Sequence, residues 1–457
     1  MEAGANEEKF ISGNLGKLMF SMSIPTIVAQ IINILYNIVD RIYIGHIPGA
    51  SSDALTGVGV ALPVIVFISA FAAFTGQGGA PLSSIWLGKG DKEHAEKILG
   101  NGTSMLIIFT VILMFVFYIW QKPLLYAFGA SDTTISYAST YLSWYLVGTI
   151  SAEIALGLNT YIIAQGNPGV AMVSVVAGAI LNIALDPLFI FVFKMGVKGA
   201  AVATVISQTV SAVWVLRFLT GRKALLKIKL CYLVPDLAII KSIFALGISP
   251  FVMRSTESLI SIVMNSGLQK YGGDIYVASL IVMQSIMQFF SAPIGGFTQG
   301  VQPLISYNFG AQNFMRVRQV YKRMILICGS FSFITTIAVM VFPEIFARIF
   351  TDDTALIELI AKKMPLFMCG MLLFGVQMAI QPVFLSLGQA KISLVIAMLR
   401  KVVLLTPLAI IFPMYSGADG VFFAEPVSDF ISAITAITLF RLNIGKILSK
   451  EKVGQIR

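Results

Sequence analysis

Long apolar stretches separated by short polar breaks run through this chain from end to end. A helix that crosses a bilayer needs about 20 mostly apolar residues, so each stretch has the length of one crossing. A membrane-spanning β-barrel would instead show alternating strands of about ten residues, and the pattern has none. The pattern predicts an all-α polytopic membrane protein with about twelve transmembrane helices, at residues 18–44, 56–80, 97–120, 134–163, 169–193, 198–219, 238–269, 275–300, 318–343, 355–386, 391–413 and 420–442.

Composition and charge support this prediction and add an orientation. Of the 457 residues, 57% are hydrophobic and 12% are charged, whereas an average soluble protein has about 25% charged residues. The net charge of +10 comes largely from basic residues in alternate connections, including 89–97, 222–229 and 316–323. Basic connections stay in the cytoplasm, so we expect both termini to be cytoplasmic. The charge reflects membrane topology, and we expect no nucleic-acid partner.

An internal repeat divides the helices into two sets. Gln77 and Gln299 are 222 residues apart, and so are Gly88 and Gly310. Six helices per half make the halves parallel repeats, related by an axis along the membrane normal. One chain then supplies both walls of a central pathway, so we expect a functional monomer in the lipid bilayer. The predicted order is a cytoplasmic N-terminal tail (1–17), an N-lobe (18–219), a basic cytoplasmic linker (220–237), a C-lobe (238–442) and a cytoplasmic C-terminal tail (443–457).

Two carboxylates, Asp40 and Asp186, lie in apolar helices of the N-lobe. A carboxylate at a bilayer centre costs about 2.5–3.5 kcal/mol on insertion scales, so a compensating interaction is expected. Asn182 precedes Asp186 by one helical turn and shares its face, and Thr204 lies at similar depth on the next helix, about 12 Å against about 15 Å from their loop. Such oxygens hold a small cation or share a proton. Alternatively, both carboxylates are capped polar residues near helix ends.

Pro25 and Pro187 interrupt two of these helices. Proline lacks a backbone donor, so each position loses one helical hydrogen bond. In membrane helices such a residue often only kinks the helix. The sequence therefore leaves two interpretations open, a simple kink or a hinge, and both prolines are hinge candidates.

The combination of Asp40, Asn182 and Asp186-Pro187-Leu188-Phe189 with the run from Gly196 to Thr204 (GVKGAAVAT) resembles the multidrug and toxic compound extrusion (MATE) family, in particular its bacterial DinF and MepA-like branch. The resemblance implies secondary active efflux of small amphipathic, mostly cationic drugs by H⁺ or Na⁺ antiport, through alternating access in the bacterial inner membrane. It also implies that the positions of Asp40, Asn182, Asp186 and Thr204 form the cation-coupling site. No cofactor is expected beyond the coupling ion, and these residues do not distinguish H⁺ from Na⁺.

Further polar residues are candidates for the substrate cavity. Asn33 and Tyr36 precede the first carboxylate on the same helix, and Asn159 lies deep in the fourth helix. Hydrogen bonds between helices are an equally good explanation of these three residues. In the C-lobe we add Glu257, because some members of the MATE family carry an acidic residue on the seventh helix, and Gln284.

The C-lobe departs from the N-lobe in its charges. The repeat pairs Asp40 with Asn265, and Thr204 with Glu425. The alternative to substrate binding by Glu257 is that the C-lobe charges neutralise one another inside the lobe. Those charges are Arg254, Glu257, Arg400, Lys401, Glu425 and Asp429. Glu153, on the fourth helix of the N-lobe, has no assigned role.

Three other functions compete with drug efflux. A lipid-linked saccharide flippase of the same superfamily would need a basic central cavity, for which Arg254, Arg400 and Lys401 are the candidates. An intramembrane enzyme is not expected, because the two histidines, His46 and His94, lie in or near loops and no catalytic cluster falls in a helix core. A passive channel fits a repeat with one carboxylate-bearing lobe less well than a transporter that gates around a fixed site.

Overall fold

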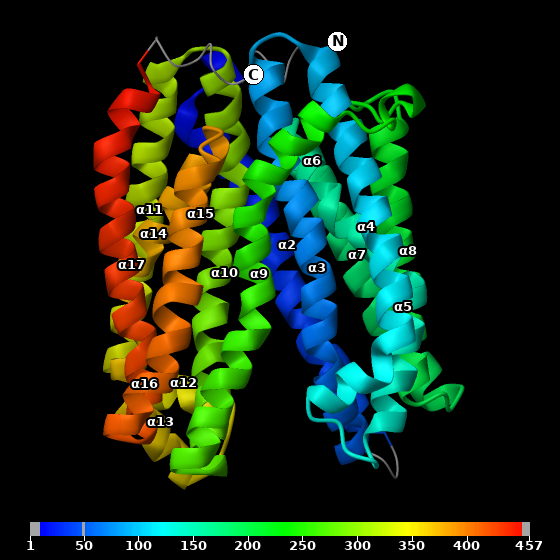
Figure 1. Cartoon of the computed structure of the whole chain (residues 1–457), viewed down its shortest axis with the longest axis vertical. Helices are drawn as coiled ribbons and strands as arrows, with labels where there is room; N and C mark the ends of the chain where they lie inside the picture. Colours follow the sequence, from blue (N-terminus) through cyan, green and yellow to red (C-terminus); the bar gives the residue numbers. More distant parts are fainter. Residues whose placement is uncertain (1–9, 48–50, 450–457) are drawn as a thin grey trace.

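The computed structural model describes residues 10–47 and 51–449, and the regular structure in these ranges is entirely helical (Figure 1). The first half contains α2 (Leu15–Gly45), α3 (Ser51–Gly88), α4 (Lys92–Ala127), α5 (Ile135–Gly157), α6 (Asn159–Ala164), α7 (Pro168–Pro187), η1 (Leu188–Val192), α8 (Val197–Thr220) and η2 (Leu230–Tyr232). The second half contains α9 (Leu237–Gly272), α10 (Asp274–Gly310), α11 (Phe314–Val341), α12 (Pro343–Arg348), α13 (Thr354–Met368), α14 (Met371–Ser386), α15 (Ala390–Met398), η3 (Leu399–Leu405), α16 (Thr406–Ser416) and α17 (Ala418–Ile447). Two of the short segments, η1 and η3, are π-helical.

The number of membrane crossings agrees with the sequence. Within the described residues, eleven helical segments are long and apolar enough to cross a bilayer, and α13 with α14 makes a twelfth if this pair, bent by 48°, counts as one crossing. Each predicted helix corresponds to one of these crossings. Several helices extend beyond the predicted limits: α3 ends at Gly88 rather than 80, and α10 ends at Gly310 rather than 300. The reason is that a drop in hydropathy marks where the chain leaves the hydrocarbon, whereas the helical hydrogen bonds continue beyond it.

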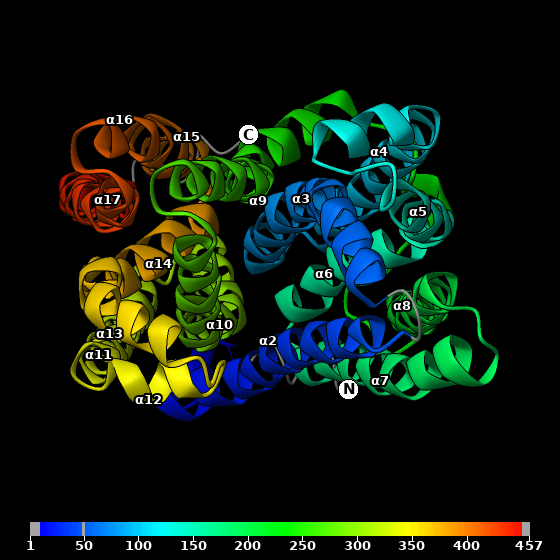
Figure 2. The ribbon, with the colours of Figure 1, turned by 90° about the horizontal axis from the view of Figure 1, so that it is seen from below.

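Two lobes stand side by side, α2 to α8 in one and α9 to α17 in the other (Figure 2). Helix α2 packs against α10, and α3 packs against α9, so each lobe contributes its first two helices to the contact with the other lobe. The predicted fold class, twelve helices in two pseudo-symmetric lobes, is confirmed. The residue limits that we gave to tails, lobes and linker stay a prediction.

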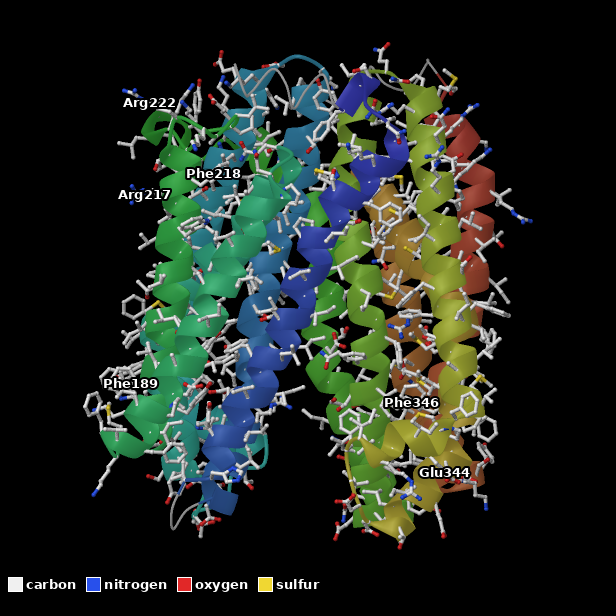
Figure 3. The ribbon with its side chains drawn as sticks, turned by 180° about the vertical axis from the view of Figure 1, so that it is seen from behind. Phe189, Arg217, Phe218, Arg222, Glu344 and Phe346 are labelled. Atoms are coloured by element: carbon white, nitrogen blue, oxygen red, sulfur yellow. The ribbon has the colours of Figure 1, made fainter. Side chains whose placement is uncertain are left out.

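The two lobes share a core in only one half of the molecule. We call the end with the start of α2 and the end of α17 the terminal face; Arg217 and Arg222 lie near it, whereas Phe189 and Glu344 lie toward the opposite face (Figure 3). One cluster of buried apolar residues contains members from both lobes and fills the terminal half. Two separate clusters, one in each lobe, fill the other half. The lobes are therefore packed together near the terminal face and apart toward the opposite face.

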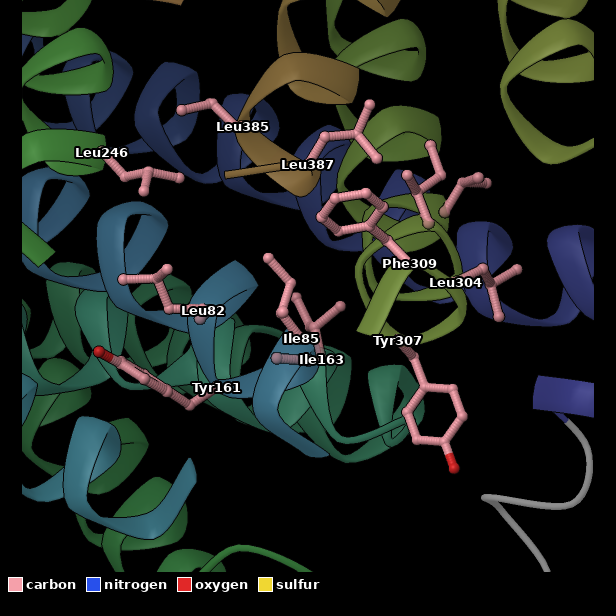
Figure 4. Packing of buried hydrophobic residues seen from close by; sticks show 14 of the residues in the cluster. Leu82, Ile85, Tyr161, Ile163, Leu246, Leu304, Tyr307, Phe309, Leu385 and Leu387 are labelled. Carbon is pink, nitrogen blue, oxygen red and sulfur yellow. The ribbon is translucent and has the colours of Figure 1, made fainter. Parts of the chain in front are cut away.

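Small residues let α3 and α10 approach closely at the terminal face. A Cβ atom added to Gly88 would overlap the carbonyl of Tyr307, and one added to Gly310 would overlap the carbonyl of Ile85. The two contacts are related by the repeat, because both Gly88 and Gly310 and Ile85 and Tyr307 are 222 residues apart. Figure 4 shows the apolar side chains that surround this contact, among them Ile85 and Leu304. Glycine at both positions allows the two backbones to touch.

Part of the predicted N-terminal tail, 1–17, is packed against the C-lobe. Residues 1–9 lie outside the described residues, but Phe10 is buried with its ring 5.2 Å from that of Tyr307. The Asn308 side-chain amide donates a hydrogen bond to the Phe10 carbonyl at 3.1 Å. Burial of the apolar surface of this aromatic residue holds the segment against the C-lobe.

The connection between the lobes, 221–236, is held against the N-lobe. The side-chain oxygen of Gln165 accepts hydrogen bonds from the amides of residues 225–226 at 2.8 and 3.0 Å. Lys229 forms an ion pair with the buried carboxylate of Glu96 at 2.5 Å, and that hydrogen bond raises the pKa of Lys229. The connection is thus a packed part of the N-lobe rather than a free tether.

Candidate functional site

Asp186 lies in the last turn of α7, directly before Pro187, and its side chain is completely buried. The helix continues beyond Pro187 as the π-helical η1, and π-helical turns occur often at functional sites. The Asn182 amide, one turn earlier, donates to Asp186 Oδ1 at 3.2 Å and lies 3.4 Å from the Thr204 hydroxyl on α8. The predicted arrangement of these three residues is therefore present.

Asp40 completes the set from α2. Its carboxyl group lies within hydrogen-bonding reach of the Asp186 carboxyl. In each carboxyl one oxygen, Oδ1 of Asp40 and Oδ2 of Asp186, has no hydrogen-bond partner within the described part of the chain. No ion pair of the described residues involves either aspartate. Two buried carboxyl groups therefore face each other, and the nearby guanidinium of Arg41 forms no ion pair with either within the described residues.

The geometry allows two kinds of ligand. Carboxylate, amide and hydroxyl oxygens are ligands for a hard monovalent or divalent cation. Alternatively, two carboxyl groups at this separation share one proton and titrate as a pair. Either ligand brings the positive charge that the pair lacks, since two adjacent carboxylates repel each other when both are charged.

A cavity of about 290 Å³ opens beside this site in the N-lobe. Its wall includes Asp40, Asn182 and Thr204, and all three of the N-lobe residues predicted to contact substrate, Asn33, Tyr36 and Asn159. Sequence reasoning missed several residues of the wall. The Tyr36 hydroxyl lies within hydrogen-bonding reach of Gln208, which follows Thr204 by one helical turn, and Tyr141 and Tyr145 have the same spacing on α5. That i, i+4 spacing was the available signal.

A second cavity of about 330 Å³ lies between the lobes and shares part of its wall with the first. The shared residues include Gln30 of α2, Gln299 of α10 and Arg254 of α9. The Gln30 amide donates to the Gln299 side-chain oxygen at 3.1 Å, across the boundary between the lobes. The N-lobe site therefore adjoins a space whose walls come from both lobes.

Comparison with known proteins identifies the family. The MatE family model matches residues 25–188 and 251–411, well over half of the chain. The chain belongs to the MatE family. The two matched segments fall one in each lobe of the structure, and the resemblance expected from the sequence is confirmed.

Several MatE relatives are similar over nearly their whole length. A solved structure of the MATE multidrug transporter DinF-BH is 34% identical, with a TM-score of 0.88 over 96% of this chain and 98% of that one. The multidrug export protein MepA of Staphylococcus aureus (strain MRSA252) is 26% identical over 431 residues, 93% of each chain. The fold is also shared, at 24% identity, with the outward-facing conformation of a MATE family multidrug resistance transporter, with a TM-score of 0.89 over 97% of this chain and 98% of that one. These relatives are named as export proteins or transporters.

The C-lobe of this MatE chain has no counterpart of the unpaired carboxylates among its described residues. Arg400, in the π-helical η3, is buried and binds the two buried acidic residues of α17: its Nε lies 2.7 Å from Asp429 Oδ1, and its Nη2 lies 3.1 Å from Glu425 Oε1. The guanidinium also lies 4.1 Å from the ring centroid of Phe374. In this cluster the charges of Arg400, Glu425 and Asp429 neutralise one another, as in the alternative considered from the sequence.

The predicted C-lobe substrate residues are not among the wall residues of the two cavities, although Glu257 lies one helical turn from Arg254, which lines both. Glu257 is on α9 with 63% of its side chain exposed, and its carboxylate is 3.8 Å from the Lys401 ammonium. Gln284, on α10, is half-buried with its amide 4.0 Å from the Met264 sulfur. Neither residue contributes to the two cavity walls. A role of either in substrate binding stays a prediction.

The two hinge candidates differ in their surroundings. Pro25 lies within α2, which continues through it, next to Thr26, whose hydroxyl donates to the Gly296 carbonyl of α10 at 2.6 Å. Pro187 ends α7 at the start of the π-helical segment, next to Asp186. Pro25 thus lies at the contact between lobes, and Pro187 lies at the candidate site. Hinge motion at either stays a prediction.

Proposed function

We propose that this protein exports amphipathic, mostly cationic compounds from a bacterial cell by antiport with H⁺ or Na⁺. The observation that carries the proposal is the pair Asp40 and Asp186, which is buried beside a cavity and forms no ion pair within the described residues. An unpaired carboxylate in a membrane protein marks an ion or substrate pathway. The names of the relatives MepA and DinF-BH, multidrug export protein and multidrug transporter, support the substrate class.

The arrangement of the lobes supports alternating access. The shared core near the terminal face and the separate cores in the other half describe a state that is open toward the opposite face. In this state the coupling ion reaches Asp40 and Asp186 and removes their repulsion. The polar contacts of α2 then change, and the substrate leaves its cavity. Coupling requires that ion and substrate favour different states or compete for one site.

We also propose that the terminal face is cytoplasmic, in the bacterial inner membrane. The basic connections 89–97, 222–229 and 316–323 all join helices at this face, and basic connections stay in the cytoplasm. The open side of the structure is then the outer side. One chain contains both lobes, which supports a monomer as the functional unit.

Transport in proteoliposomes tests the proposal. An ethidium-like cation is offered under a pH gradient or a Na⁺ gradient, imposed separately. We expect uptake under one gradient only, and this result names the coupling ion. Asp186→Asn, which keeps the size of the side chain and removes its charge, should abolish uptake in a folded, inserted protein. The matched control is Glu93→Gln, because Glu93 is an exposed carboxylate paired with Lys97 and contributes to neither cavity wall.

Two results contradict the proposal. The first is a folded wild-type protein that moves the cation under neither gradient. The second is full gradient-driven uptake by Asp186→Asn. A monodisperse size-exclusion profile of each variant in detergent establishes that lost transport is not lost folding.

The saccharide flippase has less support. A flippase for a pyrophosphate-linked lipid needs several basic residues in the central cavity. Of the three candidates only Arg254 lines the two cavities, whereas Arg400 and Lys401 face acidic residues of the C-lobe. The carboxylates on the N-lobe side of the pathway favour a cation as the substrate.

A further inference from the structure

Besides Asp40, Asp186 and the ion-paired Glu96, the N-lobe contains one more buried carboxylate, which the proposed coupling mechanism does not use. Glu153 lies on α5 with only 2% of its surface exposed. Its Oε2 atom has no hydrogen-bond partner among the described residues, and none of their ion pairs includes it. Such a charge inside a membrane protein is costly, so it needs a functional explanation.

Glu153 lies in the wall of the same N-lobe cavity as Asp40, but farther from the opposite face. Tyr141, on the same helix, is electrostatically close to Asp40, whereas Tyr145 is close to Glu153. Glu153 follows Tyr141 by twelve residues on α5, which is about 18 Å along a helix. The cavity therefore has carboxylates at two depths.

The surroundings of Glu153 suit an organic cation. The cavity wall includes the rings of Tyr36 and Tyr145 and the thioether of Met172. Aromatic faces attract ammonium and other organic cations, and methionine adapts to substrates of different shape. A small metal ion would need several oxygen ligands around one point, which aromatic rings and a thioether do not provide.

One positive side chain of the other lobe, Arg254, lies in the wall of the same cavity. Its guanidinium forms no ion pair with Glu153 within the part of the chain that the structure describes. Arg254 is also exposed, whereas Glu153 is buried. Arg41 of α2 also lies in this wall, and it too forms no ion pair with Glu153 among the described residues. A substrate cation that enters the cavity can therefore pair with the Glu153 carboxylate.

We infer that Glu153 binds the positive charge of the substrate, at a place distinct from the coupling pair Asp40 and Asp186. The ligand class is an amphipathic organic cation whose charged group lies between the Glu153 carboxylate and the Tyr145 ring. This inference rests on the proposed function, drug export, and assigns the substrate charge to one residue. Substrate affinity and ion coupling then depend on different carboxylates.

The test compares Glu153→Gln with Glu153→Asp in proteoliposomes, under the gradient that drives the wild-type protein. For an ethidium-like monocation, we expect Glu153→Gln to raise KM at least tenfold with kcat within twofold of wild type. For an uncharged dye of similar size, KM should change less than twofold. Glu153→Asp, which keeps the charge, should give a smaller rise in KM for the cation. Asp40→Asn should instead remove gradient-driven transport of both dyes.

Three results overturn the inference. Unchanged KM for the cation in Glu153→Gln means that the carboxylate does not bind the substrate. Equal losses for the charged and uncharged dyes, or a loss in kcat alone, mean that Glu153 supports the fold or the coupling step. A folded wild-type protein that binds and moves neither dye overturns the proposed function, and this inference with it. Normal wild-type transport separates the first two results from the third.

Discussion

Replacing Arg400 with methionine should destabilise the C-lobe strongly. Arg400 donates two short hydrogen bonds, at 2.7 Å to Asp429 and at 3.1 Å to Glu425, and all three side chains are buried. A hydrogen bond to a charged group contributes about 1.5–3 kcal/mol. Removal of one partner of a buried ion pair costs about 3–5 kcal/mol, because the remaining charges stay buried without compensation. We therefore expect Arg400→Met to lower the free energy of unfolding by about 3–5 kcal/mol.

The direction in which the stability of Arg400→Met changes with pH shows whether the loss comes from unpaired charge or from lost packing. In Arg400→Met the carboxyl groups of Glu425 and Asp429 have lost their cation, so protonation removes the charge that destabilises the fold. The deficit of this variant relative to wild type should therefore shrink as the pH falls and grow as it rises. A variant that also carries Glu425→Gln and Asp429→Asn has no buried charge left in the cluster. It should lie closer to wild type than Arg400→Met, because neutral replacements of a buried ion cluster often cost little.

Thermal unfolding in detergent, followed by fluorescence-detected size exclusion, measures these differences. The unfolding entropy is about 2 cal/mol/K per residue. For a chain of 457 residues, Tm therefore falls by roughly 1 °C for each kcal/mol lost from the free energy of unfolding. The expected decrease in Tm is thus about 3 °C or more for Arg400→Met at neutral pH. A Tm equal to wild type, or a triple variant as unstable as the single one at every pH, would refute the reasoning.

Two further predictions concern contacts away from the site. Gly310→Ala places a Cβ atom on the Ile85 carbonyl of the other lobe and should lower both Tm and transport; Gly445→Ala, in open space on α17, should leave both unchanged or raise Tm slightly. Gln165→Ala leaves the amides of residues 225–226 without their acceptor and should cost about 1–3 kcal/mol. Hydrogen exchange should become faster at 225–226, and unchanged exchange there would contradict the role of Gln165.

The sequence was sufficient for the helices and for the first site because both depend on strong physical signals. A long apolar run has few alternatives to a transmembrane helix. A carboxylate within such a run is rare, so Asp40 and Asp186 could be found, and helical spacing added Asn182. The repeat paired Gly88 with Gly310 before any contact was known, and the structure has each of them against the other lobe.

Other features could not be read from the chain. The π-helical segments η1 and η3 depend on local changes of hydrogen-bond register, which leave no periodicity signal. Arg400 has several acidic residues at plausible distances along the helices, and only tertiary packing selects Glu425 and Asp429 over Glu257. Phe10 looked like part of a polar tail, because a single apolar residue gives no pattern, and its partner Tyr307 is far away in the sequence.

The different charges of the two lobes bear on where coupling begins. The repeat pairs Thr204 of the N-lobe site with Glu425 of the C-lobe cluster, 221 residues apart. In the N-lobe site, Asp40 and Asp186 form no ion pair within the described residues. In the C-lobe cluster, Arg400 is already paired with Glu425. A ligand shifts a conformational equilibrium only by its difference in affinity for the two states. A cluster with a permanent cation from its own chain gains little from H⁺ or Na⁺, so we expect the ion-driven change to begin in the N-lobe. It would reach the C-lobe through α2, whose Gln30 and Thr26 bind α10 directly.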